Sequence, residues 1–166
     1  MTKLLRLALI LLLMGPLPLQ AAEQPPQPGD QPIEVTAQQL EALRAQGQTI
    51  FTGGVVAKQG DITLYCDKLV VFSQEQQQQQ QVDRLEASGH VRVVQLDRTG
   101  TAEKAIYQRQ QGILELIGSA ELHQGQNQVS GDEITLFLHE NRSIVKSGDG
   151  GRVKAVLFPE PKRKQP

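Results

Sequence analysis

Acidic residues that recur at a fixed spacing are the first candidates for chemistry in this chain. Asp67, Glu103 and Asp132 each follow a glycine by fourteen residues. Acids stacked at matching places could bind a cation, but a calcium site needs several oxygen ligands for each ion, and the repeat supplies one acid per unit. The spacing therefore favours a structural role at a bend of the chain, and no metal or cofactor is expected.

The other reactive side chains do not form a catalytic constellation. The three histidines are scattered, and the one followed by a glutamate, His139, lacks the second histidine of a zinc-protease motif. The glycine-rich stretch at residues 148–151 precedes a predicted strand and not a helix, which argues against a phosphate loop. Cys66 is the only cysteine and is expected to be a small buried hydrophobic residue. The sequence predicts no catalytic residue and no enzymatic activity.

The acids belong to a repeat of about 30 residues. The corner glycines lie in three similar segments, Phe51 to Val56, Ala87 to Arg92 and Leu116 to Glu121. A small residue precedes each acid, and apolar residues follow it at alternate positions. Strand-like pieces at such a period are typical of stacked β structure, because one unit cannot bury its apolar face alone.

Apolar and polar residues alternate within each unit, which is the period of a β-strand. Ile62, Leu64 and Cys66 share one face, and after Asp67 the alternation restarts at Leu69. A shift of one residue turns the side chains to the other face unless the backbone bends or bulges there. The acids are therefore predicted to mark corners at which each strand bends and keeps its apolar face inward.

The chain divides into four segments. Residues 1–22, which contain Lys3 and Arg6 and a short apolar stretch, are predicted to be a cleaved signal peptide, since the stretch is too short to span a bilayer. Residues 23–32 are rich in Pro and Gln and are expected to be a disordered lead-in. Residues 33–158 form the predicted domain, and residues 159–166 a basic tail. The run from Gln76 to Gln81 is expected to be a solvated loop insertion.

Composition narrows the possible partners. The chain has 17 basic and 18 acidic residues, and removal of Lys3 and Arg6 leaves an excess of three acids, which argues against nucleic acid as a partner. Aromatic residues make up 4% of the chain and tryptophan is absent, so an aliphatic inner face suits acyl chains better than sugars. On these grounds alone, the sequence favours an inner face that only packs on itself as a core.

The alternation also selects candidate binding residues and candidate edges. The inward positions, which would line a lipid-binding groove if the inner face takes a ligand, include Ile33, Val35, Val55, Ala57, Ile62, Leu64, Val71, Val91, Val93, Tyr107, Ala120, Leu122 and Leu136. The first strand (33–37) and the last strand (153–158) are expected to leave unpaired backbone groups at the two ends, which pair readily with other chains. The predicted interface residues there are Ile33, Val35, Val153, Val156 and Phe158.

Several segments together resemble the OstA-like (LptA) family of periplasmic lipopolysaccharide-transport proteins. They are Gln31 to Val35, Phe51 to Val56, Gln59 to Leu64, Asp67 to Val71, Leu116 to Ala120, Gly131 to Thr135 and Gly151 to Pro159. The resemblance extends from about Gln31 to Pro159. It departs from the family pattern at the glutamine run and at Gln38, where an acid is usual.

The resemblance implies an all-β fold, an open β-jellyroll of stacked antiparallel strands with an apolar groove along its length. It also implies a periplasmic carrier that binds lipopolysaccharide by its lipid A acyl chains and bridges the inner and outer membranes for outer-membrane assembly. Its expected partners are copies of itself, joined head to tail, and the jellyroll domains of the inner-membrane transporter complex and the outer-membrane translocon. Three alternatives stay open: a sister jellyroll protein anchored in the inner membrane, a structural β-solenoid scaffold, and an enzyme acting on envelope polymers.

Overall fold

The computed structural model describes residues 31–76 and 79–159, which form one antiparallel sheet. Its strands are β1 (Glu34–Thr36), β2 (Gln39–Leu43), β3 (Gln48–Gln59), β4 (Ile62–Gln76), β5 (Gln79–Gln95), β6 (Arg98–Gln108), β7 (Ile113–Gln124), β8 (Asn127–Phe137), β9 (Arg142–Lys146) and β10 (Lys154–Val156), with a 3-10 helix at Arg44–Gln46. No helix in this part of the chain is long and apolar enough to cross a membrane. The predicted signal peptide, most of the lead-in and most of the basic tail lie outside the described residues.

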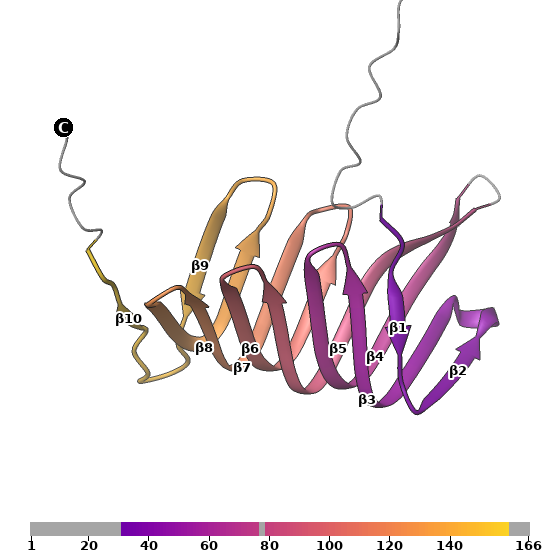
Figure 1. The fold of residues 1–166 in the computed structure, drawn as a ribbon, viewed down its shortest axis with the longest axis horizontal. Helices are drawn as coiled ribbons and strands as arrows, with labels where there is room; N and C mark the ends of the chain where they lie inside the picture. Colours follow the sequence, from indigo (N-terminus) through magenta and orange to yellow (C-terminus); the bar gives the residue numbers. More distant parts are fainter. Residues whose placement is uncertain (1–30, 77–78, 160–166) are drawn as a thin grey trace, which may run out of the picture.

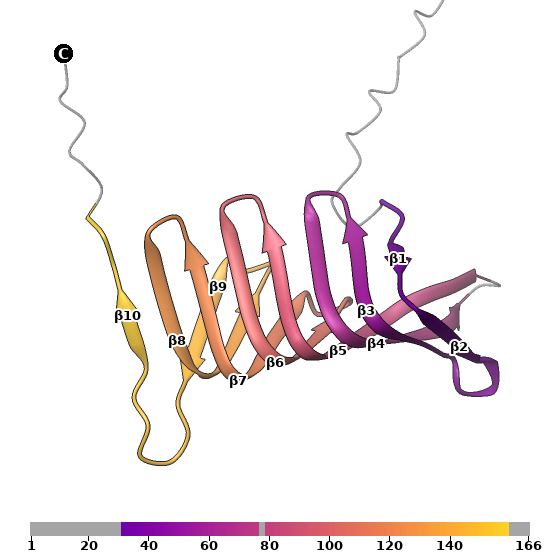
Figure 2. The same cartoon turned by 60° about the horizontal axis from the view of Figure 1, so that its bottom comes forward.

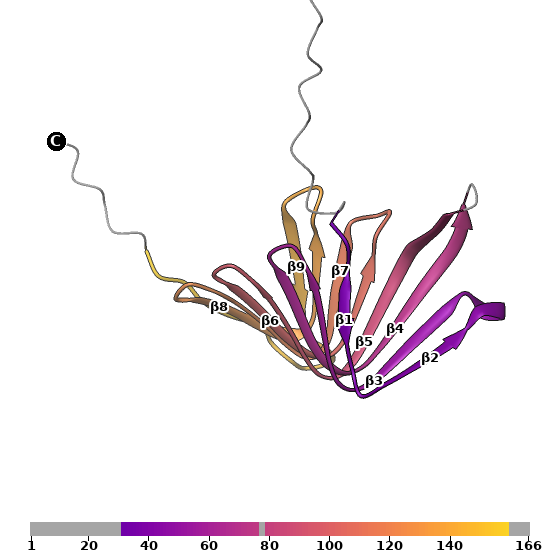
Figure 3. The same cartoon turned by 45° about the vertical axis from the view of Figure 1, so that its right-hand side comes forward.

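The long strands bend at their middle, which gives the sheet two arms. The strands pair in the order β1, β3, β4, β5, β6, β7, β8, β10, while β2 pairs with β3 and β9 pairs with β8. We call each element that crosses both arms a rung, so β1 and β2 share the first rung and β9 and β10 the last. Figure 1 shows the rungs stacked along the long axis, and Figure 3 shows the arms diverging from a common base. The predicted open all-β architecture is confirmed.

Glycines form the bends of alternate rungs. The register between β7 and β8 shifts at Gly118 and Ser119, which both have a positive φ, of 83° and 47°. Left-handed pairs also occur at Gly53-Gly54 in β3 and at Gly89-His90 in β5. Such bulges bend a strand and allow the two halves of a rung to leave in different directions. A glycine adopts this conformation at little cost, because it has no Cβ.

Each corner acid packs against a glycine of the next rung. The pairs are Asp67 with Gly89, Glu103 with Gly118 and Asp132 with Gly148, and Gln38 lies in the same way against Gly53. A Cβ on Gly118 would come within 2.8 Å of the Glu103 carboxyl carbon. The Gly148 amide donates a hydrogen bond of 2.5 Å to Asp132 Oδ2. The predicted corner role of the acids is confirmed, and Gln38 takes the same place without a charge.

The core lies on the inner face of the bent sheet. Its buried members are Val55, Ala57, Cys66, Leu69, Ala87, Val91, Ala105, Leu116, Ala120 and Ile134. Cross-strand register aligns Leu69, Ala87, Ala105, Leu116 and Ile134 in one row across five strands. Because each strand from β3 to β8 contributes one or two apolar side chains, the core runs along the stack and has no single centre.

The glutamine run is not the loop that the sequence predicted. β4 extends to Gln76 and β5 begins at Gln79, and the two strands stay paired out to these residues. The neighbouring β6–β7 hairpin closes earlier, at Gln108 and Ile113. The insertion therefore lengthens a hairpin. The loop prediction was wrong because it considered only apolar burial, whereas a backbone ladder that starts from a rigid sheet can continue through polar residues.

Shortening this hairpin by about six residues is expected to change the free energy of unfolding by no more than roughly 1 kcal/mol, because the removed residues form a polar extension of the β4–β5 ladder and the entropy of closing the remaining turn varies slowly with its length. The core residues lie on other parts of the strands. Urea denaturation of the shortened and full-length proteins measures the difference. A loss of several kcal/mol would mean that the hairpin tip contributes packing.

Candidate functional site

The apolar inner face is the candidate site, and it has a buried base and half-buried flanks. The base is the core cluster beside the corners, including Val55, Val91 and Ala120. The half-buried apolar residues packed against it are Val35, Phe51, Leu64, Val71, Leu85, Val93, Ala102, Leu114, Leu122, Leu136 and Val145. The flanks are the part of this face that a ligand can reach without displacing the core.

The structure divides the sequence-predicted groove residues between these two zones. Val55, Ala57, Val91 and Ala120 are buried in the base, and Val35, Leu64, Val71, Val93, Leu122 and Leu136 belong to the flanks. Tyr107 pairs with the inner-face residue Leu85, and Ile62 is two residues from the inner-face residue Leu64 on the same strand. Both side chains therefore face inward, and both are half-buried. Ile33 precedes β1 and is half-buried. Their binding of lipid stays a prediction.

Several inner residues were not among the sequence-predicted groove residues. Phe51, Ala87 and Leu116 each precede a corner glycine by two residues and lie on the inner face, as do Leu85 and Leu114. In the strands that carry the glycines, every second residue faces inward on both sides of the corner, because the glycine itself occupies one of these inward positions. Counting backwards from each glycine would have found these residues.

Cys66 is a core residue with an unreactive thiol. Its side chain is 5% exposed, and burial, with the nearby charge of Asp67 as a smaller cause, raises the pKa of the Cys66 thiol to about 11. The thiolate is the nucleophilic form of cysteine, so the thiol is nearly inert at neutral pH. The structural role expected from the sequence is confirmed.

The outer face of the sheet carries charged groups that pair with each other. Glu86 accepts ion pairs from Arg84 at 3.1 Å and from Lys104 at 3.4 Å. The Arg92 guanidinium lies 4.3 Å from the centre of the Tyr65 ring. The same outer row also contains Ile50, Val70 and Ile106, so the outer face mixes charged and aliphatic side chains, whereas the inner face is almost wholly apolar.

Both ends of the sheet have open edges with exposed apolar side chains. β1 and β10 are the two edge strands of one arm, at opposite ends of the stack. β2 and β9 are the two edge strands of the other arm. Leu157 is 71% exposed at the last rung, and Leu40 is 58% exposed at the first. The exposed apolar residues of the last rung also include Ile144, Val153, Val156 and Phe158. β1 and β10 are shorter than the predicted first and last strands, at three residues each.

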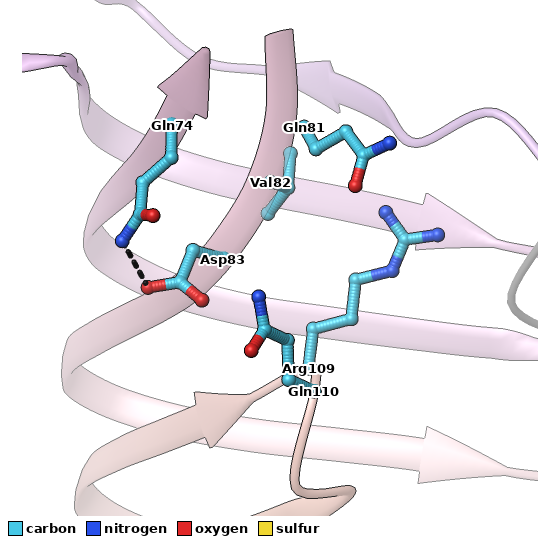
Figure 4. A pocket seen from close by; sticks show the side chains of 6 residues that line it. All are labelled: Gln74, Gln81, Val82, Asp83, Arg109 and Gln110. Atoms are coloured by element: carbon cyan, nitrogen blue, oxygen red, sulfur yellow. Dashed lines mark hydrogen bonds between the residues drawn. The ribbon is translucent and has the colours of Figure 1, made fainter. Parts of the chain in front are cut away.

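A separate small pocket lies beside the lengthened hairpin. It has a volume of about 220 Å³ and is lined by Gln74, Gln81, Val82, Asp83, Arg109 and Gln110. Gln74 Nε2 donates a hydrogen bond of 3.2 Å to Asp83 Oδ2 (Figure 4). Ligand pockets usually span roughly 300–1,000 Å³ and are mostly apolar, so this one is not the candidate site. Nowhere in the described ranges do three His, Cys, Asp or Glu side chains gather as a metal site.

Together these features define a class of protein: an open β-jellyroll of stacked hairpins with an apolar inner face and unpaired edges at both ends. A family model described as LptA/(LptD N-terminal domain) LPS transport protein matches residues 34–142. The chain belongs to this family of lipopolysaccharide-transport proteins, as its sequence segments suggested. It is accordingly a transport protein and not an enzyme.

Individual relatives agree with this assignment. The lipopolysaccharide export system proteins LptA of Escherichia coli K12 and of Shigella flexneri are each 31% identical to the chain over 137 residues, which cover 78% of this chain and 72% of theirs. The crystal structure of LptH from Pseudomonas aeruginosa, described as the LptA homologous periplasmic component of the lipopolysaccharide transport device, matches with a TM-score of 0.71 at 20% identity. It covers 81% of this chain and 100% of that one. This last likeness supports the fold.

Proposed function

We propose that this chain is a periplasmic carrier that binds lipopolysaccharide by the acyl chains of lipid A and bridges the inner and outer membranes. The observation that carries the proposal is the aliphatic inner face, which continues through every rung from Val35 to Val145. The name of the relative LptA, a lipopolysaccharide export system protein, supports lipopolysaccharide as the cargo. The description of LptH as a periplasmic component supports the periplasm as the compartment.

The acyl chains would lie along the flanks of the inner face. On one arm Ala57, Leu64, Val93, Gly100, Leu122 and Val129 follow one another in register, and on the other arm Val71, Leu85, Tyr107, Leu114 and Leu136 do so. Neighbouring strands lie about 4.8 Å apart, so a row over six strands runs for roughly 24 Å along the stack. Because side chains fill the base, deeper binding requires the two arms to separate.

Binding of purified protein to lipopolysaccharide tests this function against its main rival. A carrier is expected to bind lipopolysaccharide saturably. A long-chain amphiphile is expected to displace the lipopolysaccharide, because both would place their acyl chains on the same flanks. A structural scaffold with a closed core would not bind it, and that result would overturn the proposal. The N-terminus of the mature protein separates the carrier from an anchored sister protein, which would retain residues 1–22.

The open edges support head-to-tail assembly of the carrier. The row that begins at Leu40 and Phe51 ends at Val145, and the row that begins at Val35 ends at Ala155. If the last rung of one copy pairs with the first rung of the next, both rows continue, with Val145 opposite Leu40 and Ala155 opposite Val35. This contact is heterologous, so it extends without closing. The jellyroll domains at the two membranes would pair with the ends in the same way.

One register satisfies both arms of this junction. In the last rung Val145 and Ala155 are ten positions apart in the chain, and their partners in β8, Ile134 and Val129, are five positions apart. The two contact positions of the first rung, Val35 and Leu40, are also five positions apart. The first rung of a second copy can therefore pair with the free side of the last rung in the manner of β8.

A further inference from the structure

The inner face of one arm ends in a row of polar side chains at its free rim. This rim carries the turns of the β3–β4, β5–β6 and β7–β8 hairpins, which Figure 2 shows side by side. The last backbone pairs before the turns are Gln59 with Ile62, Gln95 with Arg98 and Gln124 with Asn127. Ile62 also pairs with Gln95, and Arg98 with Gln124, so the six positions form one row. We call the five polar members the amide rim.

The amide rim lies on the same face as the aliphatic flank. Each of its members is two residues from an inner-face position of its own strand: Ala57, Val93, Gly100, Leu122 and Val129, respectively. Alternate residues of a strand share a face of the sheet. The face therefore changes from aliphatic to amide and guanidinium within one step along each of five strands. Only Ile62 interrupts the polar row.

Arg98, the charged member of the amide rim, is available to bind a ligand. Gln95 Nε2 donates a hydrogen bond of 3.2 Å to Asp61 Oδ2, and the Phe158 amide donates one of 2.8 Å to Asn127 Oδ1. Arg98 is exposed and makes no side-chain hydrogen bond or ion pair with any residue that the structure describes, including the adjacent Asp97. Its charge thus faces solvent beside the apolar flank.

We propose that the amide rim binds the phosphorylated sugar head of the lipid whose acyl chains lie on the adjacent flank, with Arg98 on a phosphate. This inference rests on the proposed function. A guanidinium donates paired hydrogen bonds that match phosphate oxygens, and amide side chains both donate to and accept from hydroxyl groups. An amphiphile that is apolar at one end and anionic at the other finds both surfaces within one strand length. Asp61 and Asp97 in the turns oppose a long-range attraction, so the contact depends on direct hydrogen bonds.

The test compares lipid A with its dephosphorylated form, which carries the same acyl chains, for the wild type and for Arg98→Gln. The wild type is expected to bind the phosphorylated lipid more tightly by on the order of tenfold, the effect of one charge-assisted hydrogen-bonded pair, and Arg98→Gln to bind both forms equally. Arg92→Gln, on the outer face, is the matched control and should keep the preference. Arg98→Lys should restore part of it.

The outcomes separate the rim from the proposed function. If the wild type binds neither lipid, the proposed carrier function fails, and the rim with it. If the wild type binds both lipids equally, or Arg98→Gln keeps the full preference, the rim assignment is overturned while the carrier function stands. Loss of the preference in Arg92→Gln as well would also overturn it, since the effect would then depend on net charge. Because Arg98 is an exposed turn-flanking residue, the variant is expected to fold, and circular dichroism checks this.

Discussion

Replacing Gly118 by alanine is expected to lower the free energy of unfolding by roughly 2–4 kcal/mol, because a side chain there is strained in two ways. The residue has a φ of 83°, and a Cβ would come within 2.8 Å of the Glu103 carboxyl carbon and 2.9 Å of its Cβ. The corner would have to open for both to fit. Urea denaturation of the two proteins measures the difference.

Gly125→Ala is the matched control for this substitution. Gly125 also has a positive φ, of 57°, but a Cβ built on it meets no atom within 4 Å. Its replacement carries only the cost of the left-handed conformation, about 1 kcal/mol. Equal losses for the two variants would show that the packing of Glu103 on the glycine does not hold the corner together.

Val156→Pro is expected to abolish concentration-dependent oligomers and to leave a folded monomer that still binds lipopolysaccharide. Proline has no amide donor and does not fit a paired strand, so β10 can no longer offer an edge to a second copy. β10 is exposed along its whole length, and the core residues lie in β3 to β8, so the rest of the sheet should remain folded. Light scattering over a range of concentrations gives the oligomer size, and cells carrying the variant should fail to bridge their membranes.

Two comparisons make this result specific. Leu96→Asp removes an exposed apolar side chain far from either edge and should leave the oligomers unchanged. In a Cys66→Ala background, cysteine at position 145 in one copy should form a disulfide with cysteine at position 40 in another, but not with cysteine at position 41, whose side chain points to the opposite face. Oligomers of unchanged size in Val156→Pro would contradict edge pairing.

The corners and the inward parity could be predicted from the sequence because they depend on local features. The one-residue shift after Asp67 is visible in the alternation, and the structure places a corner there. Val55, Leu64 and Val93 likewise fall on the inner face. In each case the period of two within a strand specifies the face, and the repeat of about 30 residues specifies which strands are equivalent.

Other features depend on which residues become neighbours across strands, and a single strand does not contain that information. Gln95, Arg98 and Gln124 look like ordinary polar residues beside turns, and only the register of three strands aligns them in one row. The glutamine run resembled a loop because its side chains offer no apolar pattern, yet its backbone continues the ladder of β4 and β5. The lengths of the edge strands are determined by their partners in the same way.

Site-specific photo-crosslinking of lipopolysaccharide tests the central claim most directly. Crosslinkers at the half-buried inner positions Leu64, Val93, Tyr107 and Leu122 are expected to capture lipopolysaccharide, and crosslinkers at the outer positions Lys58, Arg92 and Glu121 are not. Val55, which is 1% exposed in the base, should capture it only if the arms separate. Capture confined to the inner flank positions supports a carrier whose cargo lies on the aliphatic face. Equal capture at the inner and outer sets would contradict it.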